Sequence, residues 1–220
     1  MCFSASASFG AAILLTGVGT LTLKKVQNRN QIPFAAIPLL FAIHQVLEGL
    51  VWLALTKSGY DGILASATHF YLFFAQILWP VWIPVAIFFL VPKERRNLLH
   101  KGLVIAGGLI AAYLTYCLIT YPVNAYILGH HMAYDQTAYP KDLRTYIAAP
   151  YLLVILLPLF ISGIRNMWVL GVLGMVSYGV TAIFYSDFKV SVWCFFAAII
   201  STVVYIIVAK LKPDAPVPND

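Results

Sequence analysis

Charged residues are scarce in this 220-residue sequence. Asp, Glu, Lys and Arg together make up 10% of it, against roughly 25% in soluble domains. So few charges cannot cover the surface of a water-soluble fold of this size, which excludes an ordinary soluble domain. Cysteine is also rare: Cys2, Cys117 and Cys194 are too few and too scattered for a disulfide framework or a paired-cysteine metal motif.

The sequence lacks the short motifs that would name a reaction. It has no HExxH zinc motif, no GxSxG nucleophile elbow, no Walker loop and no GxGxxG dinucleotide motif. No lysine lies deep in the last apolar run, where a retinal chromophore would be attached, because Lys189 and Lys210 flank that run. The sequence therefore leaves open whether the protein is an enzyme.

Hydrophobic residues, in contrast, make up 61% of the chain, and the mean hydropathy is +0.86. They form long runs, each near the ~20 residues that cross a ~30 Å hydrocarbon layer. We predict an all-α integral membrane bundle of about seven transmembrane helices, forming one domain over residues 1–212 with a disordered cytoplasmic tail, 213–220. The predicted spans are about 7–23, 32–56, 63–91, 99–121, 146–163, 167–184 and 190–209.

The basic residues predict the orientation of the bundle. The net charge is +6. Because cytoplasmic loops of membrane proteins are enriched in Lys and Arg, this excess indicates which loops are cytoplasmic and does not indicate binding of a nucleic acid. Most basic residues follow the odd-numbered spans: Lys24, Lys25, Arg29, Lys93, Arg95, Arg96, Lys101, Arg165, Lys210 and Lys212. We therefore expect the N-terminus outside and the C-terminus in the cytoplasm.

One connection, residues 122–145, is much longer than the others and would lie on the outer face. It contains Tyr126, Tyr134 and Tyr139, and tyrosine favours the boundary between membrane and water. We expect this segment to fold back on the bundle as an interfacial cap. Its adjacent histidines, His130 and His131, point in different directions in any regular structure and do not form a two-ligand metal motif.

Glu48 is the one acidic residue that falls inside a predicted span. A carboxylate there costs about 2.5 to 3.5 kcal/mol on insertion scales, so it marks a candidate site for which a partner must be sought. His44 lies four residues earlier and Trp52 four residues later, so all three share one helix face.

In the next span, His69 and Gln76 are seven residues apart and would also share a face. If the two spans pack as an antiparallel hairpin, Glu48 meets His69 and His44 meets Gln76 at similar depths. This arrangement predicts a ligand site of His44, Glu48, His69 and Gln76. It would bind a metal ion, a haem or a small polar ligand, or transfer protons. The alternative is that these side chains only hold two helices together.

If a metal is bound, its predicted ligands are His44, Glu48, His69 and Cys2, the last as an amine and thiol chelate after removal of Met1. Further polar side chains lie in the outer half of later spans and could line a cavity open to the outside: Thr115, Tyr116, Cys117, Tyr178, Thr181 and Cys194. A membrane enzyme acting on a lipid or lipid-linked substrate, with Cys194 or Thr115 as nucleophile, is a second hypothesis. A transporter or a structural subunit is a third.

Two segments carry a resemblance to a known family. The opening Met1-Cys2-Phe3-Ser4-Ala5 and the stretch from His44 to Trp52, HQVLEGLVW, resemble a family of uncharacterised bacterial multi-pass membrane proteins. The resemblance implies a location in the bacterial inner membrane and adds no reaction.

Overall fold

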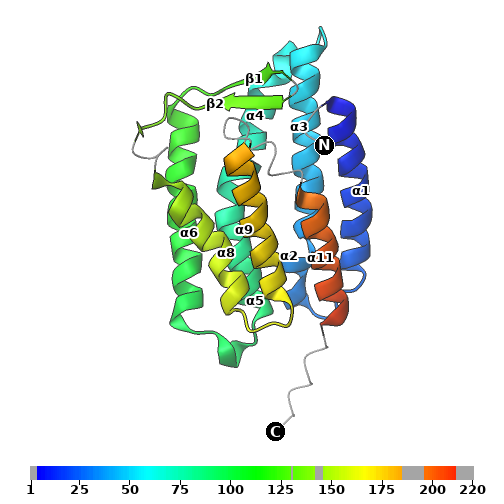
Figure 1. Ribbon diagram of the computed structural model, residues 1–220, viewed down its shortest axis with the longest axis vertical. Helices are drawn as coiled ribbons and strands as arrows, with labels where there is room; N and C mark the ends of the chain where they lie inside the picture. Colours follow the sequence, from blue (N-terminus) through cyan, green and yellow to red (C-terminus); the bar gives the residue numbers. More distant parts are fainter. Residues whose placement is uncertain (1–3, 130, 142–145, 185–195, 212–220) are drawn as a thin grey trace.

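The computed structural model describes residues 4–129, 131–141, 146–184 and 196–211, and within these ranges the chain is mostly helical. Seven apolar helical segments run alternately away from and toward the end of the bundle that carries a small β-hairpin (Figure 1). Helix α1 begins at this hairpin end, and α11 ends at the opposite end (Figure 1).

The first four segments contain the longest helices. Helix α1 spans Ala5–Leu23. The second segment consists of a 3-10 turn, Arg29–Gln31, followed by α2 (Ile32–Ala35) and α3 (Ile37–Thr56). The third consists of a 3-10 turn, Asp61–Ile63, then α4 (Leu64–Leu72), a π-helical stretch, Phe73–Leu78, and α5 (Trp79–Leu90). After another 3-10 turn, Lys93–Arg95, helix α6 spans Leu98–Thr120.

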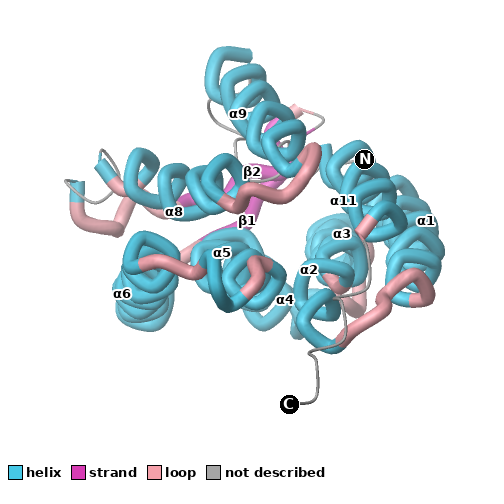
Figure 2. The backbone as a smooth tube through the Cα atoms, turned by 90° about the horizontal axis from the view of Figure 1, so that it is seen from below, coloured by secondary structure: helices cyan, strands magenta, loops and turns pink. Residues whose placement is uncertain are grey.

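Three helices complete the bundle: α8 (Ala148–Ile161), α9 (Met167–Phe184) and α11 (Ala197–Lys210). Viewed from below, α3, α5, α8, α9 and α11 are arranged as a ring (Figure 2). Helix α1 packs outside this ring against α3 and α11.

The predicted helical bundle is confirmed to this extent: the described part of the chain is mostly helical and contains seven apolar helical segments. Five segments are long and apolar enough to cross a membrane: Ala5–Leu23, Arg29–Thr56, Asp61–Leu90, Leu98–Thr120 and Met167–Phe184. Helices α8 and α11 are apolar but shorter, with 14 residues each. The start of the predicted span 190–209 and the predicted tail 213–220 lie outside the described residues.

The long connection contains the β-hairpin, an element that differs from the predicted all-α fold. Strand β1 (Asn124–Leu128) pairs antiparallel with β2 (His131–Asp135). Gly129 has φ +63°, a value that two-residue hairpin turns need and glycine adopts without strain. Ala125 and Met132 are buried in the same apolar cluster as Tyr71 of α4. The hairpin therefore covers the ends of the neighbouring helices, as expected of a cap.

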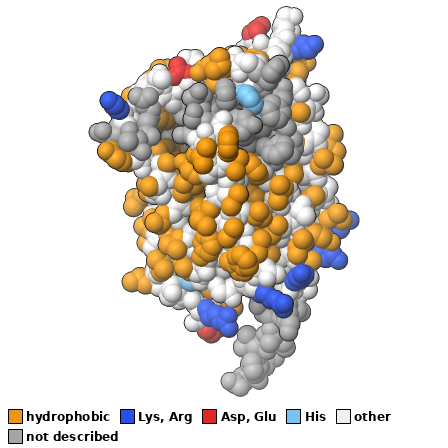
Figure 3. All heavy atoms as spheres, viewed as in Figure 1, with side chains coloured by type: hydrophobic (Ala, Val, Ile, Leu, Met, Phe, Trp, Pro, Cys, Tyr) orange, Lys and Arg blue, Asp and Glu red, His pale blue; other side chains and the backbone are white. Residues whose placement is uncertain are grey.

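The surface of the bundle is apolar around its middle. Hydrophobic side chains form a broad band across the face in Figure 3, and Lys and Arg side chains lie toward its two ends. On α6, Ile105, Leu109 and Ile119 expose more than half of their surface. Such a band suits the hydrocarbon layer of a bilayer, where exposed apolar side chains carry no cost.

Candidate functional site

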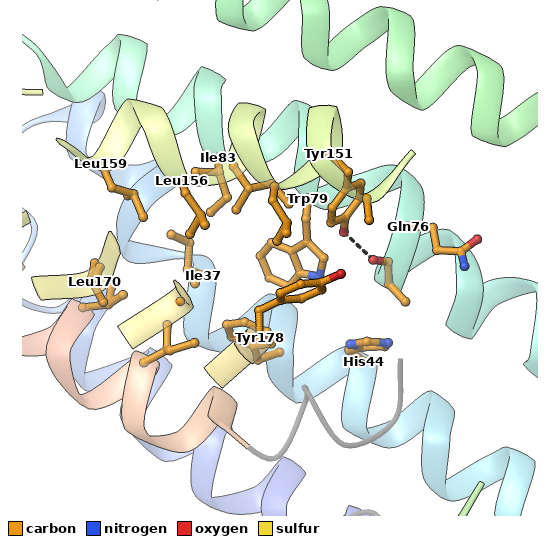
Figure 4. A pocket seen from close by; sticks show the side chains of 18 of the residues that line it. Ile37, His44, Gln76, Trp79, Ile83, Tyr151, Leu156, Leu159, Leu170 and Tyr178 are labelled. Carbon is orange, nitrogen blue, oxygen red and sulfur yellow. Dashed lines mark hydrogen bonds between the residues drawn. The ribbon is translucent and has the colours of Figure 1, made fainter. Parts of the chain in front are cut away.

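A cavity of about 320 Å³ lies inside the ring of helices, within the size range of small-ligand pockets. Helices α3, α5, α8, α9 and α11 all contribute to its wall, as does the π-helical stretch before α5. Figure 4 shows Trp79, Tyr178 and His44 around one space, and the Gln76 side chain lies to one side of this space. Most of the lining side chains are apolar, with a few polar groups among them, which is the usual composition of a small-molecule site.

The polar lining groups gather at one end of this cavity. Along α3 the lining residues are Ile37, Phe41 and His44, and α3 runs toward the hairpin end, so the histidine is nearest the hairpin. Along α9, Leu170 is followed by Tyr178 in the same direction. The cavity therefore has a polar end near the hairpin and an apolar end on the opposite side.

The helices that run the other way show the matching order. In the third segment Gln76 precedes Ile83, and in α8 Tyr151 precedes Leu159. Both helices descend from the hairpin end (Figure 1), so their polar residues also lie near the hairpin. Four helical segments thus place a polar group at one level, and that level is the polar end of the cavity.

Gln76 lies in the π-helical stretch, where the regular helix is interrupted. Pro80 has no N–H for the Gln76 carbonyl four residues earlier, so ordinary α-helical bonding cannot continue through this point. The Tyr151 hydroxyl donates a hydrogen bond of 2.6 Å to the carbonyl oxygen of Ala75 in the same stretch. Helix α8 is thereby fixed to the π-helical turn, as the dashed line in Figure 4 shows.

The side-chain amide of Gln76 also joins the cavity to the cap. It donates to the Gln136 amide oxygen at 2.9 Å and accepts from the Gln136 amide nitrogen at 3.0 Å. Gln136 directly follows β2. The wall of the cavity and the hairpin are therefore connected by a reciprocal pair of hydrogen bonds.

A stack of rings connects the cavity to the hairpin along a second line. The His44 ring lies 4.4 Å from the Tyr71 ring, measured between centroids, and the Tyr71 ring lies 4.7 Å from that of Tyr134 in β2. His44 and Tyr71 are both 0% exposed. The hairpin segment contains one more buried aromatic side chain, Tyr139, and burial raises the pKa of its phenol.

The structure brings together two of the four predicted site residues in the cavity wall. His44 and Gln76 both line the cavity. Glu48 is fully buried one turn further along α3 but is not a lining residue. The predicted pairing of Glu48 with His69 is not found, because His69 is exposed and its Nδ1 lies 2.8 Å from the Ala65 carbonyl oxygen of its own helix.

The reason is the helical phase of the third segment. The buried residues of α4 include Ala67, Thr68 and Tyr71, so His69 lies on the opposite side. A spacing of seven places His69 and Gln76 on one face only in a continuous α-helix with 3.6 residues per turn. The π-helical stretch adds residues to the turn, so a spacing of seven no longer places both side chains on one face.

The remaining predicted polar residues have varied positions. Tyr178 lines the cavity, whereas Thr181 is buried and donates to the Ser177 carbonyl at 2.8 Å. Thr115 likewise donates to the Ala111 carbonyl of its own helix, at 2.7 Å. Tyr116 is exposed, and Cys117 is buried in the apolar cluster around Tyr71.

Metal ligation was a further prediction for this region. Cys2, His130 and Cys194 lie outside the described residues. Among the residues that the structure does describe, no group of three or more His, Cys, Asp and Glu side chains could hold a metal ion. The described cavity wall offers one histidine, His44, and otherwise amide and hydroxyl groups, a donor set that suits an organic ligand better than a metal or a haem.

Most of the lining residues could not be identified from the sequence, Trp79, Tyr151 and Gly174 among them. Trp79 and Tyr151 were interpreted only as parts of apolar runs, and Gly174 carried no signal at all. An isolated tyrosine within the apolar run of α8 was the one available indication, since a buried tyrosine hydroxyl needs a hydrogen-bond partner.

The helices and the cavity define the class: this is a multi-pass membrane protein with a partly open cavity between its helices that is polar at one end. The chain belongs to the family of unknown function DUF6629, whose sequence model matches residues 1–218. This confirms the predicted membership of a family without an assigned activity. No curated protein and no solved structure matches the chain.

Proposed function

We propose that this protein binds an amphipathic organic ligand inside the membrane. The ligand would place its polar group beside His44, Gln76 and Tyr178 and its apolar part toward Ile37 and Leu159. The observation that supports this proposal is the segregation of polar and apolar lining along the axis of the cavity. A wall of uniform polarity would give a ligand no preferred direction.

We further propose that the polar end faces the outside of the cell and that the membrane is the inner membrane. Basic residues concentrate at the end opposite the hairpin, at Lys24, Lys25, Lys93, Arg95 and Arg165. Cytoplasmic loops carry such an excess. The hairpin then lies on the outer face, and the ligand's polar group lies beneath it.

Reporter fusions test this orientation. A reporter that is active only in the periplasm is expected to be inactive when fused after Lys212 and active when inserted near Asp135 in the hairpin. Both fusions should be compared at equal protein levels in the membrane. Activity after Lys212 together with silence near Asp135 would invert the proposed topology.

Within the site, His44 and Gln76 would hydrogen-bond the ligand's polar group. His44 is held by its contact with the Tyr71 ring, and Gln76 is held by Gln136. Glu48 would act from behind this wall, since it is buried one turn away on the same face of α3. Both site groups are thus fixed before a ligand enters, which lowers the entropy lost on binding.

Photolabelling tests the binding proposal. A long-chain alcohol that carries a diazirine and an alkyne should label residues of the cavity wall when irradiated with the purified protein. Ile200 lines the cavity, whereas its neighbour Ile199 is 49% exposed. Ile200→Trp should fill the space and abolish this labelling, and Ile199→Trp should leave it unchanged.

A second matched pair of variants distinguishes a filled cavity from the misfolding of a single variant. Leu152 lines the cavity and Leu153 is 55% exposed, so Leu152→Trp should repeat the loss and Leu153→Trp should not. Equal labelling of lining and outward-facing residues, unaffected by either filled-cavity variant, would refute ligand binding in this cavity.

A further inference from the structure

The polar end of the cavity contains no formally charged side chain among the described lining residues. Its polar members are His44, Gln76, Tyr151 and Tyr178, and no Lys, Arg, Asp or Glu joins them. An ionised head group placed there would leave water without an ion-pair partner, at a cost of several kcal/mol. The buried ionisable residue nearest to this end on α3 is an acid, Glu48, and an acidic side chain does not attract an anion.

The same groups can satisfy a neutral polar group. The Gln76 amide uses one N–H and one oxygen lone pair in its hydrogen bonds with Gln136. A side-chain amide has two N–H donors and two lone pairs on its oxygen, so Gln76 keeps a second N–H and a second lone pair. The Tyr151 hydroxyl donates to the Ala75 carbonyl and is held in place by this bond. The Gln76 amide thus offers one donor and one acceptor at the polar end.

Aromatic rings form much of the wall at this level. Phe41 and Trp79 pack with their ring centroids 4.4 Å apart at 33°, and both line the cavity with His44 and Tyr178. Figure 4 shows Trp79, Tyr178 and His44 around the same space. Aromatic rings pair favourably in offset-stacked or edge-to-face arrangements, so a planar ring can pack against this wall.

We infer that the ligand's head group is uncharged, planar and carbonyl-bearing, as in a quinone with an alkyl or prenyl chain. This inference rests on the proposed function, since it specifies the ligand of the same cavity. The apolar wall from Ile37 to Leu159 would hold the start of the chain, and the second N–H of Gln76 would donate to a ring carbonyl.

Competition against the photoreactive alcohol tests the inference, with three competitors that share one chain: decylbenzoquinone, decanol and decanoic acid. At neutral pH the quinone should displace half of the label at a concentration at least about tenfold below that of decanoate. Decanol should fall between them. His44→Phe, which keeps a ring of similar size, should weaken the quinone and leave decanoate unchanged. Ile43→Phe, at a residue 47% exposed, is the matched control and should change neither.

The outcomes separate this inference from the proposed function. If the alcohol labels the cavity but decanoate competes as well as the quinone, the neutral head group is refuted and the binding cavity stands. If His44→Phe and Ile43→Phe affect the quinone equally, the head group does not lie at the polar end and the inference fails. If the alcohol does not label the cavity at all, the proposed function fails.

Discussion

Gly107→Ala is expected to destabilise the protein by about 1–3 kcal/mol, an overpacking cost caused by a single methyl group. A Cβ on Gly107 would run into the carbonyl oxygen of Pro80, and it would lie 3.2 Å from a Val154 methyl carbon. Backbone cannot rotate away from such a contact as a side chain could. Helices α5, α6 and α8 therefore approach one another at a position where only glycine fits, as is common in membrane helix packing.

Two prolines explain why this carbonyl faces a neighbouring helix. The Pro80 carbonyl would normally accept from the N–H of residue 84, but residue 84 is also proline and has none. The Cα of Gly107 can then approach the exposed oxygen and form a weak C–H···O contact. The contact with α6 thus gives the Pro80 carbonyl oxygen a weak partner in place of the helical hydrogen bond that Pro84 cannot supply.

Gly108→Ala provides the matched control, because nothing lies within 4 Å of a Cβ at that position. Alanine has a higher helix propensity than glycine by about 1 kcal/mol, so this variant should melt at the same temperature as the wild type or higher. Thermal unfolding in detergent, followed by circular dichroism, measures both. Equal stability of the two variants would show that Gly107 does not pack against Pro80.

Tyr71→Ala is expected to cost on the order of 3 kcal/mol and to loosen the hairpin. Tyr71 is 0% exposed and its ring lies between those of His44 and Tyr134. In a bilayer the cost comes from lost packing contacts and not from exposure to water, because lipid tails are as apolar as the protein interior. The space left by the missing ring would lie between Tyr134 in the hairpin and His44 in the cavity wall, and the contact between them would be lost.

Phe70→Ala is the control for this substitution, since Phe70 is adjacent and 61% exposed. It should change stability by no more than about 0.5 kcal/mol. Limited proteolysis within residues 122–141 reports on the hairpin: cleavage should accelerate in Tyr71→Ala only. Equal cleavage rates in the two variants would contradict the role of the ring stack in holding the cap.

The helical segments could be predicted because a bilayer imposes simple requirements. Each crossing needs an apolar run of about twenty residues, and the runs at 7–23, 99–121 and 167–184 agree closely with α1, α6 and α9. The hairpin was harder to predict because its strands have five residues each. Runs so short show no periodicity that distinguishes a strand from a loop.

The site could be predicted only in part. His44 was found because it lies one turn before Glu48, the acidic residue whose place within a predicted span is unusual. The shared lining of His44 with Gln76 follows from the antiparallel packing of α3 on the third segment. His69 was misplaced because a π-helical turn cannot be read from residue spacing. Tyr178 was named among the polar side chains that could line a cavity, and it lines this one. Tyr151 could not be predicted, because it reaches the cavity through the packing of α8, which depends on contacts between segments far apart in sequence.

Mass spectrometry of the lipids that remain bound after purification would test the central claim most directly. The wild type, Ile200→Trp and Ile199→Trp would be purified in parallel and extracted. We predict one amphipathic compound in stoichiometric amount in the wild type and in Ile199→Trp, and its loss from Ile200→Trp. An identical lipid profile in three equally folded samples would contradict the claim that the cavity holds a ligand.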